Sequence, residues 1–101
     1  MSTTAAAELT DRLRRISAME RVARLISWDQ ETQMPRRGAA QRAEEAAAVA
    51  AALHALEADP GLAEAIEAAA QPAVRPDARG VVQIAEARRI HHRATRVPAG
   101  L

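Results

Sequence analysis

Apolar residues recur at helical spacing in four stretches of the chain, at about residues 8–28, 39–58, 60–70 and 77–95. The first stretch is the most regular, because its apolar positions follow each other at intervals of three or four residues over about five turns. These positions are Leu9, Leu13, Ile16, Met19, Val22 and Ile26, with Leu25 beside them. The pattern predicts a long amphipathic helix over residues 8–28, preceded by a flexible tail at residues 1–7.

Proline and glycine mark the ends of the other predicted helices. Pro35 and Gly38 separate the first helix from the second, Asp59 suits an N-cap, and Pro60 suits the first position of a third helix. Two prolines lie within residues 71–77, which we predict to be a loop. The apolar positions of the later helices are Ala46, Val49, Leu53 and Leu56, then Leu62 and Ile66, and finally Val81, Ile84, Ala85 and Ile90. The fold class predicted is all-α, an antiparallel helical hairpin or bundle of three to four helices.

The composition makes the expected core thin. The chain of 101 residues holds 27 alanines, whereas Leu, Ile and Val together number only 18, with one Trp and no Phe or Tyr. Alanine favours helices but buries little surface, and the shortage of β-branched and aromatic residues argues against a β fold. We therefore expect the helices to bury apolar faces against a partner, either a second copy in a dimer or higher oligomer or a larger body.

Charge and targeting signals narrow the expected partners. The net charge is +1 and acidic residues are interleaved with the arginines, so no broad field attracts nucleic acid or an anionic membrane. All 14 basic residues are Arg, which we attribute to a coding bias rather than to phosphate recognition. The chain has no Cys, no secretory signal pattern and no apolar run long enough to span a bilayer. We expect a cytoplasmic protein that binds neither nucleic acid nor membrane.

The inventory of reactive side chains predicts no catalytic, cofactor-binding or metal-ligating residue. His91 and His92 are adjacent and point about 100° apart on a helix, so they cannot bind one metal from one face. His54 has no second ligand at helical spacing other than Glu57, which makes a weak pair. No serine has a His or Asp at a local spacing that would suggest activation, and the four glycines form no phosphate-binding loop.

Residues 28–35, Trp-Asp-Gln-Glu-Thr-Gln-Met-Pro, concentrate the unusual residue types at the predicted end of the first helix. Trp28 can seal that end, while Asp29 or Thr32 can bond backbone groups freed in the turn. Met34 can fill a gap beneath the tryptophan. By residue type alone this segment is interpreted as a structural corner rather than a binding site.

The same segment carries a resemblance to a known family. The string from Leu25 to Pro35, followed by Gly38-Ala39, Arg42-Ala43 and Leu53-His54, resembles the N-terminal signature of the carboxypeptidase Taq family of metallopeptidases. The Arg-rich segment at residues 87–98, which ends in Val-Pro, resembles the next landmark of that family. The signature residues are Trp28, Asp29, Gln30, Thr32, Met34, Pro35, Arg42 and His54, and we assign them a structural role.

The resemblance implies largely helical, cytoplasmic enzymes that remove C-terminal residues from peptides. It also implies a zinc or cobalt ion held by a His-Glu-x-x-His helix and a downstream glutamate, with the intervening Glu as general base. His-Glu-x-x-His does not occur in this sequence, so no ligand or base can be assigned to any position here. Residues 8–101 resemble the opening helices of the family, which flank the substrate groove as a lid-like part before a larger catalytic body.

Two hypotheses share every residue of this sequence. In the first, the chain is the non-catalytic N-terminal portion of a metallocarboxypeptidase, and peptide substrate is relevant only in the context of the whole enzyme. In the second, it is a stand-alone helical module for oligomerisation or protein interaction without enzymatic activity.

Overall fold

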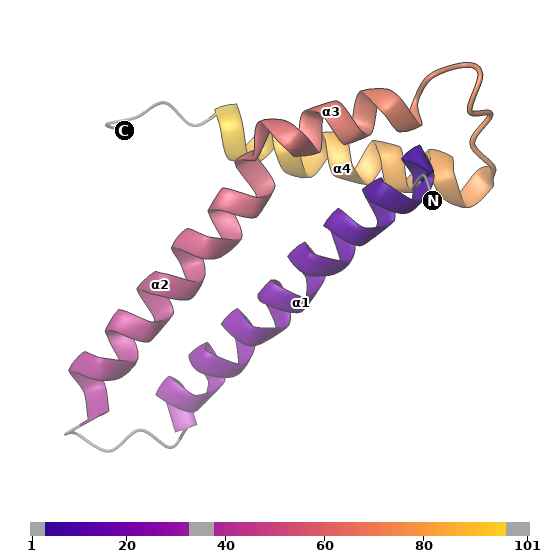
Figure 1. Ribbon diagram of the computed structural model, residues 1–101. Coiled ribbons are helices and arrows are strands. Elements are labelled where there is room, and N and C mark those ends of the chain that lie inside the picture. Colours follow the sequence, from indigo (N-terminus) through magenta and orange to yellow (C-terminus); the bar gives the residue numbers. More distant parts are fainter. Residues whose placement is uncertain (1–3, 33–37, 97–101) are drawn as a thin grey trace.

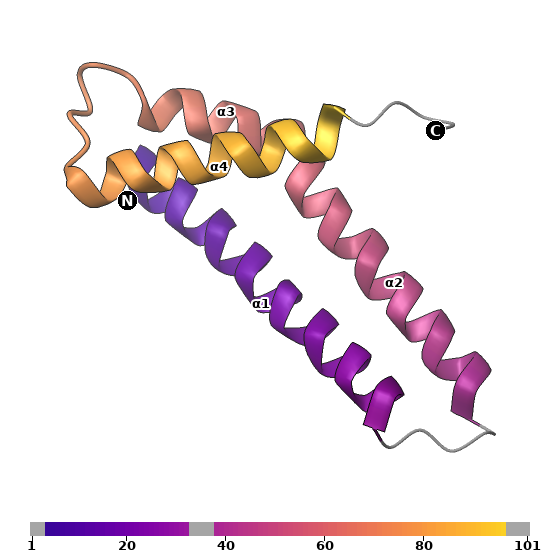
Figure 2. The ribbon, with the colours of Figure 1, turned by 180° about the vertical axis from the view of Figure 1, so that it is seen from behind.

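The computed structural model describes residues 4–32 and 38–96, with their side chains except those of residues 29–32. These residues form four α-helices and no strand: α1 (Ala5–Thr32), α2 (Ala39–Ala58), α3 (Pro60–Ala69) and α4 (Ala78–Arg96). Helices α1 and α2 make a long antiparallel hairpin, and α3 and α4 form a second antiparallel pair across one end of it (Figures 1 and 2). The predicted all-α class is confirmed.

The bounds of α2, α3 and α4 agree with the predicted helices to within one residue at each end. Helix α1 is longer than predicted at both ends. It begins at Ala5, because the Thr4 hydroxyl oxygen accepts a hydrogen bond from the Ala7 backbone N–H at 3.0 Å and alanine is a strong helix former. Residues 5–7 are thus helical rather than a flexible tail, and residues 1–3 lie outside the described part. At its other end α1 continues past Trp28 to Thr32, since residues 29–32 contain no proline or glycine.

Carboxylates cap the two later helices. The Asp59 side chain accepts a hydrogen bond from the Gly61 backbone N–H at 2.9 Å, and Pro60 occupies the first position of α3, as predicted. Asp77 Oδ1 accepts from the Gly80 backbone N–H at 2.8 Å at the start of α4. The predicted loop at residues 71–77 contains no helix.

The core lies at the junction where α3 and α4 cross the hairpin. Its buried residues are Leu9 and Ile16 from α1, Leu62, Ala65, Ile66 and Ala69 from α3, and Ala87 from α4. Leu53 and Leu56 of α2, together with Ile84 and Ile90 of α4, pack against this cluster while partly buried. The core is small, and three of its seven buried residues are alanine.

Two predicted apolar faces are wrong in part. In α4 the buried face is centred on Ala87, with Ile84 and Ile90 on either side of it. Val81 is 56% exposed and Ala85 is also exposed, because at about 100° per residue both point away from the Ala87 direction. In α1 the apolar stripe is buried only near the core, at Leu9 and Ile16, and farther along the helix Val22 and Leu25 are 42% and 66% exposed.

The hairpin extends well beyond the core. The molecule measures 56 × 31 × 25 Å with a radius of gyration of 16.7 Å, against about 13 Å for a compact chain of this length. We call the protruding part, residues 17–32 and 39–52, the hairpin arm. No described side chain in the hairpin arm is buried. Among the described helices none is long and apolar enough to cross a membrane.

Candidate functional site

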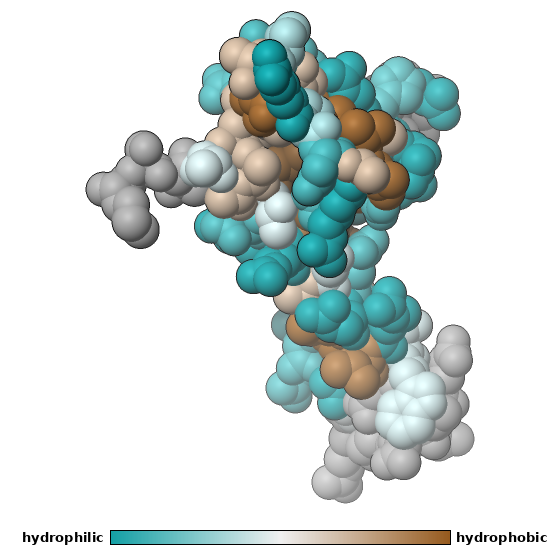
Figure 3. All heavy atoms as spheres, turned by 90° about the vertical axis from the view of Figure 1, so that its right-hand side faces the viewer, coloured by the Kyte–Doolittle hydropathy of each residue, from teal (hydrophilic) through white to brown (hydrophobic). Residues whose placement is uncertain are grey.

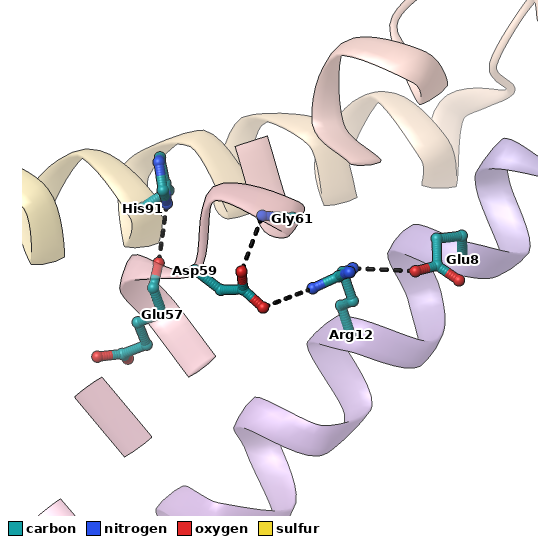
Figure 4. A network of polar contacts seen from close by, with 6 residues as sticks. All are labelled: Glu8, Arg12, Glu57, Asp59, Gly61 and His91. Atoms are coloured by element: carbon teal, nitrogen blue, oxygen red, sulfur yellow. Dashed lines mark hydrogen bonds and ion pairs between the residues drawn. The ribbon is translucent and has the colours of Figure 1, made fainter. Parts of the chain in front are cut away.

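The three histidines lie on two helices and differ in their surroundings. His54 is exposed on α2, and His92 is exposed on α4. His91 is half-buried, and its Nδ1–H donates to the Glu57 backbone carbonyl oxygen at 2.9 Å, which ties α4 to the end of α2 (Figure 4). Within residues 4–28 and 38–96 no group of three or more His, Asp or Glu side chains could hold a metal ion. The described residues therefore do not fit a zinc or cobalt site.

A network of polar contacts joins α1 to the start of α3 (Figure 4). Arg12 Nε lies 3.0 Å from Glu8 Oε1, and Arg12 Nη1 lies 3.2 Å from Asp59 Oδ2. The hydrogen bond from Gly61 N–H and the nearby Arg12 guanidinium lower the pKa of the Asp59 carboxyl. This network joins α1 to the start of α3 through side-chain contacts.

Glu57 lies close to the same junction. Desolvation raises the pKa of its carboxyl, and the negative charge of Glu20 on α1 raises it further, whereas Arg93 and His54 act in the opposite direction. Glu57 also supplies the carbonyl that His91 bonds, so this residue joins α2 to α4, while the charge of Glu20 on α1 repels its carboxylate. Its perturbed pKa accompanies a structural junction rather than a pocket.

An apolar groove on the hairpin arm is the first candidate for a binding surface. Side chains from both arm helices line this groove of about 330 Å³, namely Val22, Leu25, Ile26, Trp28 and Arg42. Trp28 is 56% exposed, and Arg42 forms an ion pair with Glu45 at 2.7 Å. Figure 3 shows apolar side chains gathered on the arm near its free end. Contiguous apolar patches on a protein surface are often interaction sites, which makes this groove a candidate.

Side chains are described for three of the signature residues, Trp28, Arg42 and His54, and of these Trp28 and Arg42 line this groove together. Trp28 lies one turn before the end of α1 and is exposed, so it does not seal the end of the helix as predicted. His54 lies twelve positions after Arg42 on α2, about 18 Å along the helix axis. The backbone of Asp29, Gln30 and Thr32 is in the last turn of α1, while Met34 and Pro35 lie outside the described residues.

A second groove, which no pattern in the sequence predicts, lies between α1 and α4. It has a volume of about 770 Å³, and its lining includes Arg14, Arg21 and Arg79. The spacing of Arg14 and Arg21 places them on one face of α1, which the sequence alone could have shown. Their approach to Arg79 depends on how α4 packs across the hairpin, and no local pattern encodes that packing.

The described residues thus form a segment of four helices with an apolar groove on its hairpin arm. They include no group of three or more side chains that could hold a metal ion. The model of the family described as carboxypeptidase Taq (M32) metallopeptidase matches residues 8–101, so the chain belongs to this family. A comparison with curated proteins gave no match. A comparison with solved structures gave none either.

Proposed function

We propose that this chain serves as a non-catalytic N-terminal helical portion of a metallocarboxypeptidase that removes C-terminal residues from peptides. The observation that carries the proposal is the family match over residues 8–101, which covers all four helices apart from the first three residues of α1. In this role the helices flank the substrate groove as a lid-like part. A cytoplasmic location belongs to the same proposal.

The absence of the metal-binding motif supports a non-catalytic role. The family is metal-dependent, and its zinc or cobalt ion requires His ligands at i, i+4 spacing with a Glu between them. That motif does not occur among these 101 residues. His54, His91 and His92 are spread over two helices, and His91 already bonds a backbone carbonyl. The ion of a full-length enzyme therefore needs ligands other than these.

The exposed face of the hairpin arm supports docking on a larger body. Val22 and Leu25 continue the stripe that is buried nearer the core, and burial of such side chains is worth about 1.5–3 kcal/mol each. The hairpin arm does not bury these side chains itself, since α2, the helix that packs beside α1 in the arm, contains no buried residue. A catalytic body that covers this face would supply the burial that the four helices lack.

Metal binding by the purified chain tests the proposal. Equilibrium dialysis against micromolar zinc or cobalt is expected to leave much less than one ion per chain, and replacement of His54 by Ala is expected to change nothing. One tightly bound ion per chain would overturn the non-catalytic assignment.

A stand-alone oligomerisation module is the second candidate function, favoured by the same exposed face of the arm. A second copy could cover Val22 and Leu25 as well as a catalytic body could, and a thin core makes self-association favourable. Under this hypothesis the chain forms a dimer or higher oligomer at micromolar concentration.

Sedimentation separates this hypothesis from the first. The module hypothesis predicts a dimer that Leu25→Glu converts to a monomer, with Val82→Glu as the matched control at an equally exposed position of α4. Trp28 is the only tryptophan, so its emission reports on the arm alone and should shift to the blue as the dimer forms. A monomer at high micromolar concentration, with emission that does not depend on concentration, would contradict the module hypothesis.

A further inference from the structure

We propose that the groove between α1 and α4 binds an acidic peptide segment of a partner protein, with an apolar side chain at one end of the bound segment. This inference is independent of the proposed function, since the groove lies on the core end of the molecule rather than on the arm. It rests on three features of the described residues: fixed walls, unpaired positive charge and an adjoining apolar pocket.

The two walls of the groove are held together. Thr10 on α1 donates from its hydroxyl to Gln83 Oε1 on α4 at 3.0 Å, and both residues line the groove. Leu9, next to Thr10, is 1% exposed and anchors this part of α1 in the core. The bond from Gly80 N–H to Asp77 fixes the first turn of α4 at the rim. A ligand would therefore meet a groove that is already formed, which lowers the cost of binding.

Positive charge dominates the lining. Arg14, Arg21 and Arg79 are exposed, and none of them forms an ion pair with another described residue. Among the described residues of the lining Asp77 alone carries a carboxylate, and its Oδ1 accepts the bond that caps α4. By contrast, Arg12, also on α1, is neutralised by Glu8 and Asp59. The guanidinium groups are thus left to bind carboxylates, for which their planar donors are well suited.

An apolar pocket opens at the end of the groove nearest the N-terminus of α1. Its volume is about 220 Å³, and it shares Ala6, Asp77, Gly80 and Gln83 with the groove. Its apolar walls come from Leu9, Ala69, Val74, Pro76 and Ile84. The pocket is large enough for one aliphatic side chain.

The spacing of the arginines suggests the form of the ligand. Arg14 and Arg21 are seven residues apart, about 10.5 Å along α1, which an extended peptide spans in about three residues. Side chains of an extended peptide alternate between its two faces, so a segment with one leucine-like residue followed by acidic residues at every second position would fill the pocket and present its carboxylates to the face that holds both guanidinium groups. A peptide fits better than a nucleic acid, because none of the described residues that line the groove has an aromatic side chain for base stacking and the pocket is mainly apolar.

The probe is a fluorescein-labelled synthetic peptide in which a leucine is followed by glutamates at this spacing, and binding is measured by fluorescence anisotropy at low salt. Saturable binding that weakens as salt is added is expected. The double variant Arg14→Gln, Arg79→Gln is expected to bind about tenfold more weakly, since two exposed ion pairs are lost. The matched control is Arg15→Gln, Arg89→Gln, which removes the same charge from exposed positions outside the groove and is expected to bind as the unaltered chain does.

Three further probes complete the test on the unaltered chain. Replacing the leucine of the peptide by serine should weaken binding several-fold, and replacing its glutamates by lysines should abolish binding. Equal losses in the two double variants, or no saturable binding of the glutamate peptide, would overturn the proposal. Tighter binding of a single-stranded oligouridine than of the peptide, lost in the Arg14, Arg79 variant, would overturn it in favour of nucleic acid.

Discussion

Arg12 Nη1 lies 3.2 Å from Asp59 Oδ2. Arg12 lies on α1 between the buried residues Leu9 and Ile16, and Asp59 is the residue that caps α3, so this ion pair connects α1 to the start of α3. Asp59 thus has two roles, because one oxygen bonds the Gly61 backbone N–H and the other receives the guanidinium. The hairpin and the crossing pair of helices meet at this residue (Figure 4). The geometry of the junction therefore depends on a side chain outside the apolar core.

Substitutions of Asp59 separate the two roles. Asp59→Asn keeps an oxygen that can cap α3 but loses the charge, whereas Asp59→Ala loses both, so Ala should destabilise the fold more than Asn. Urea denaturation at pH 7 measures the free energy of unfolding of both variants and of the unaltered chain. Equal losses for Asn and Ala would show that the cap contributes nothing.

Acid should weaken the same junction. The folded state lowers the pKa of Asp59 below its usual value near 3.8, so the stabilisation is complete above that value and is lost as the pH falls through the lower, folded value. The stability of Asp59→Asn should therefore depend less steeply on pH below about 4 than that of the unaltered chain. Parallel pH profiles for the two proteins would contradict this assignment.

Glu57 should show the opposite dependence on pH. Its pKa is raised above its usual value of 4.5 by desolvation and by Glu20, so the charged form costs stability once the pH rises through the folded pKa. Glu57→Gln should therefore raise the melting temperature at pH 7 and leave it unchanged below the unfolded pKa. Glu44→Gln, at an exposed position of the same helix, controls for the loss of one charge. A melting temperature that Glu57→Gln lowers at pH 7 would rule out this account.

Leu62 should be the most sensitive position of the core. Leu62 is 0% exposed, and only four of the buried residues described in this core are larger than alanine. Few neighbouring side chains could therefore move into the cavity that truncation of Leu62 would leave. Leu62→Ala should cost about 3 kcal/mol and the milder Ile66→Val about 1 kcal/mol. Val82→Ala, at a position 64% exposed, should change stability by less than about 0.5 kcal/mol. Chemical denaturation measures all three, and similar values for Leu62 and Val82 would show that the core lies elsewhere.

The helices followed from the sequence because their signals are local. The Asp59-Pro60 start of α3 and the proline-containing loop after it were predicted and are present. Helix α1 begins three residues before the predicted start, because Thr4 caps it and alanines follow. Pro35 and Gly38 predict a break over residues 29–38, yet the helix continues to Thr32 because residues 29–32 contain neither proline nor glycine.

The surfaces could not be predicted in the same way. Val22 and Leu25 continue a regular apolar stripe, and periodicity alone gives no sign that the core stops at Ile16. Leu9 and Ile16 are buried against residues of α3 and α4, which come much later in the chain. How far the stripe of α1 is buried therefore depends on tertiary packing. The groove that brings Arg79 to Arg14 and Arg21 has the same origin.

Release of C-terminal amino acids from a peptide by the purified chain tests the central claim most directly, namely that these helices carry no catalytic centre of their own. The assay is made with zinc or cobalt added, and with a family member that contains His-Glu-x-x-His as the positive control. The account predicts no release above that of buffer containing the same metal. Release that rises in proportion to the concentration of the chain and stops when a chelator is added would contradict it.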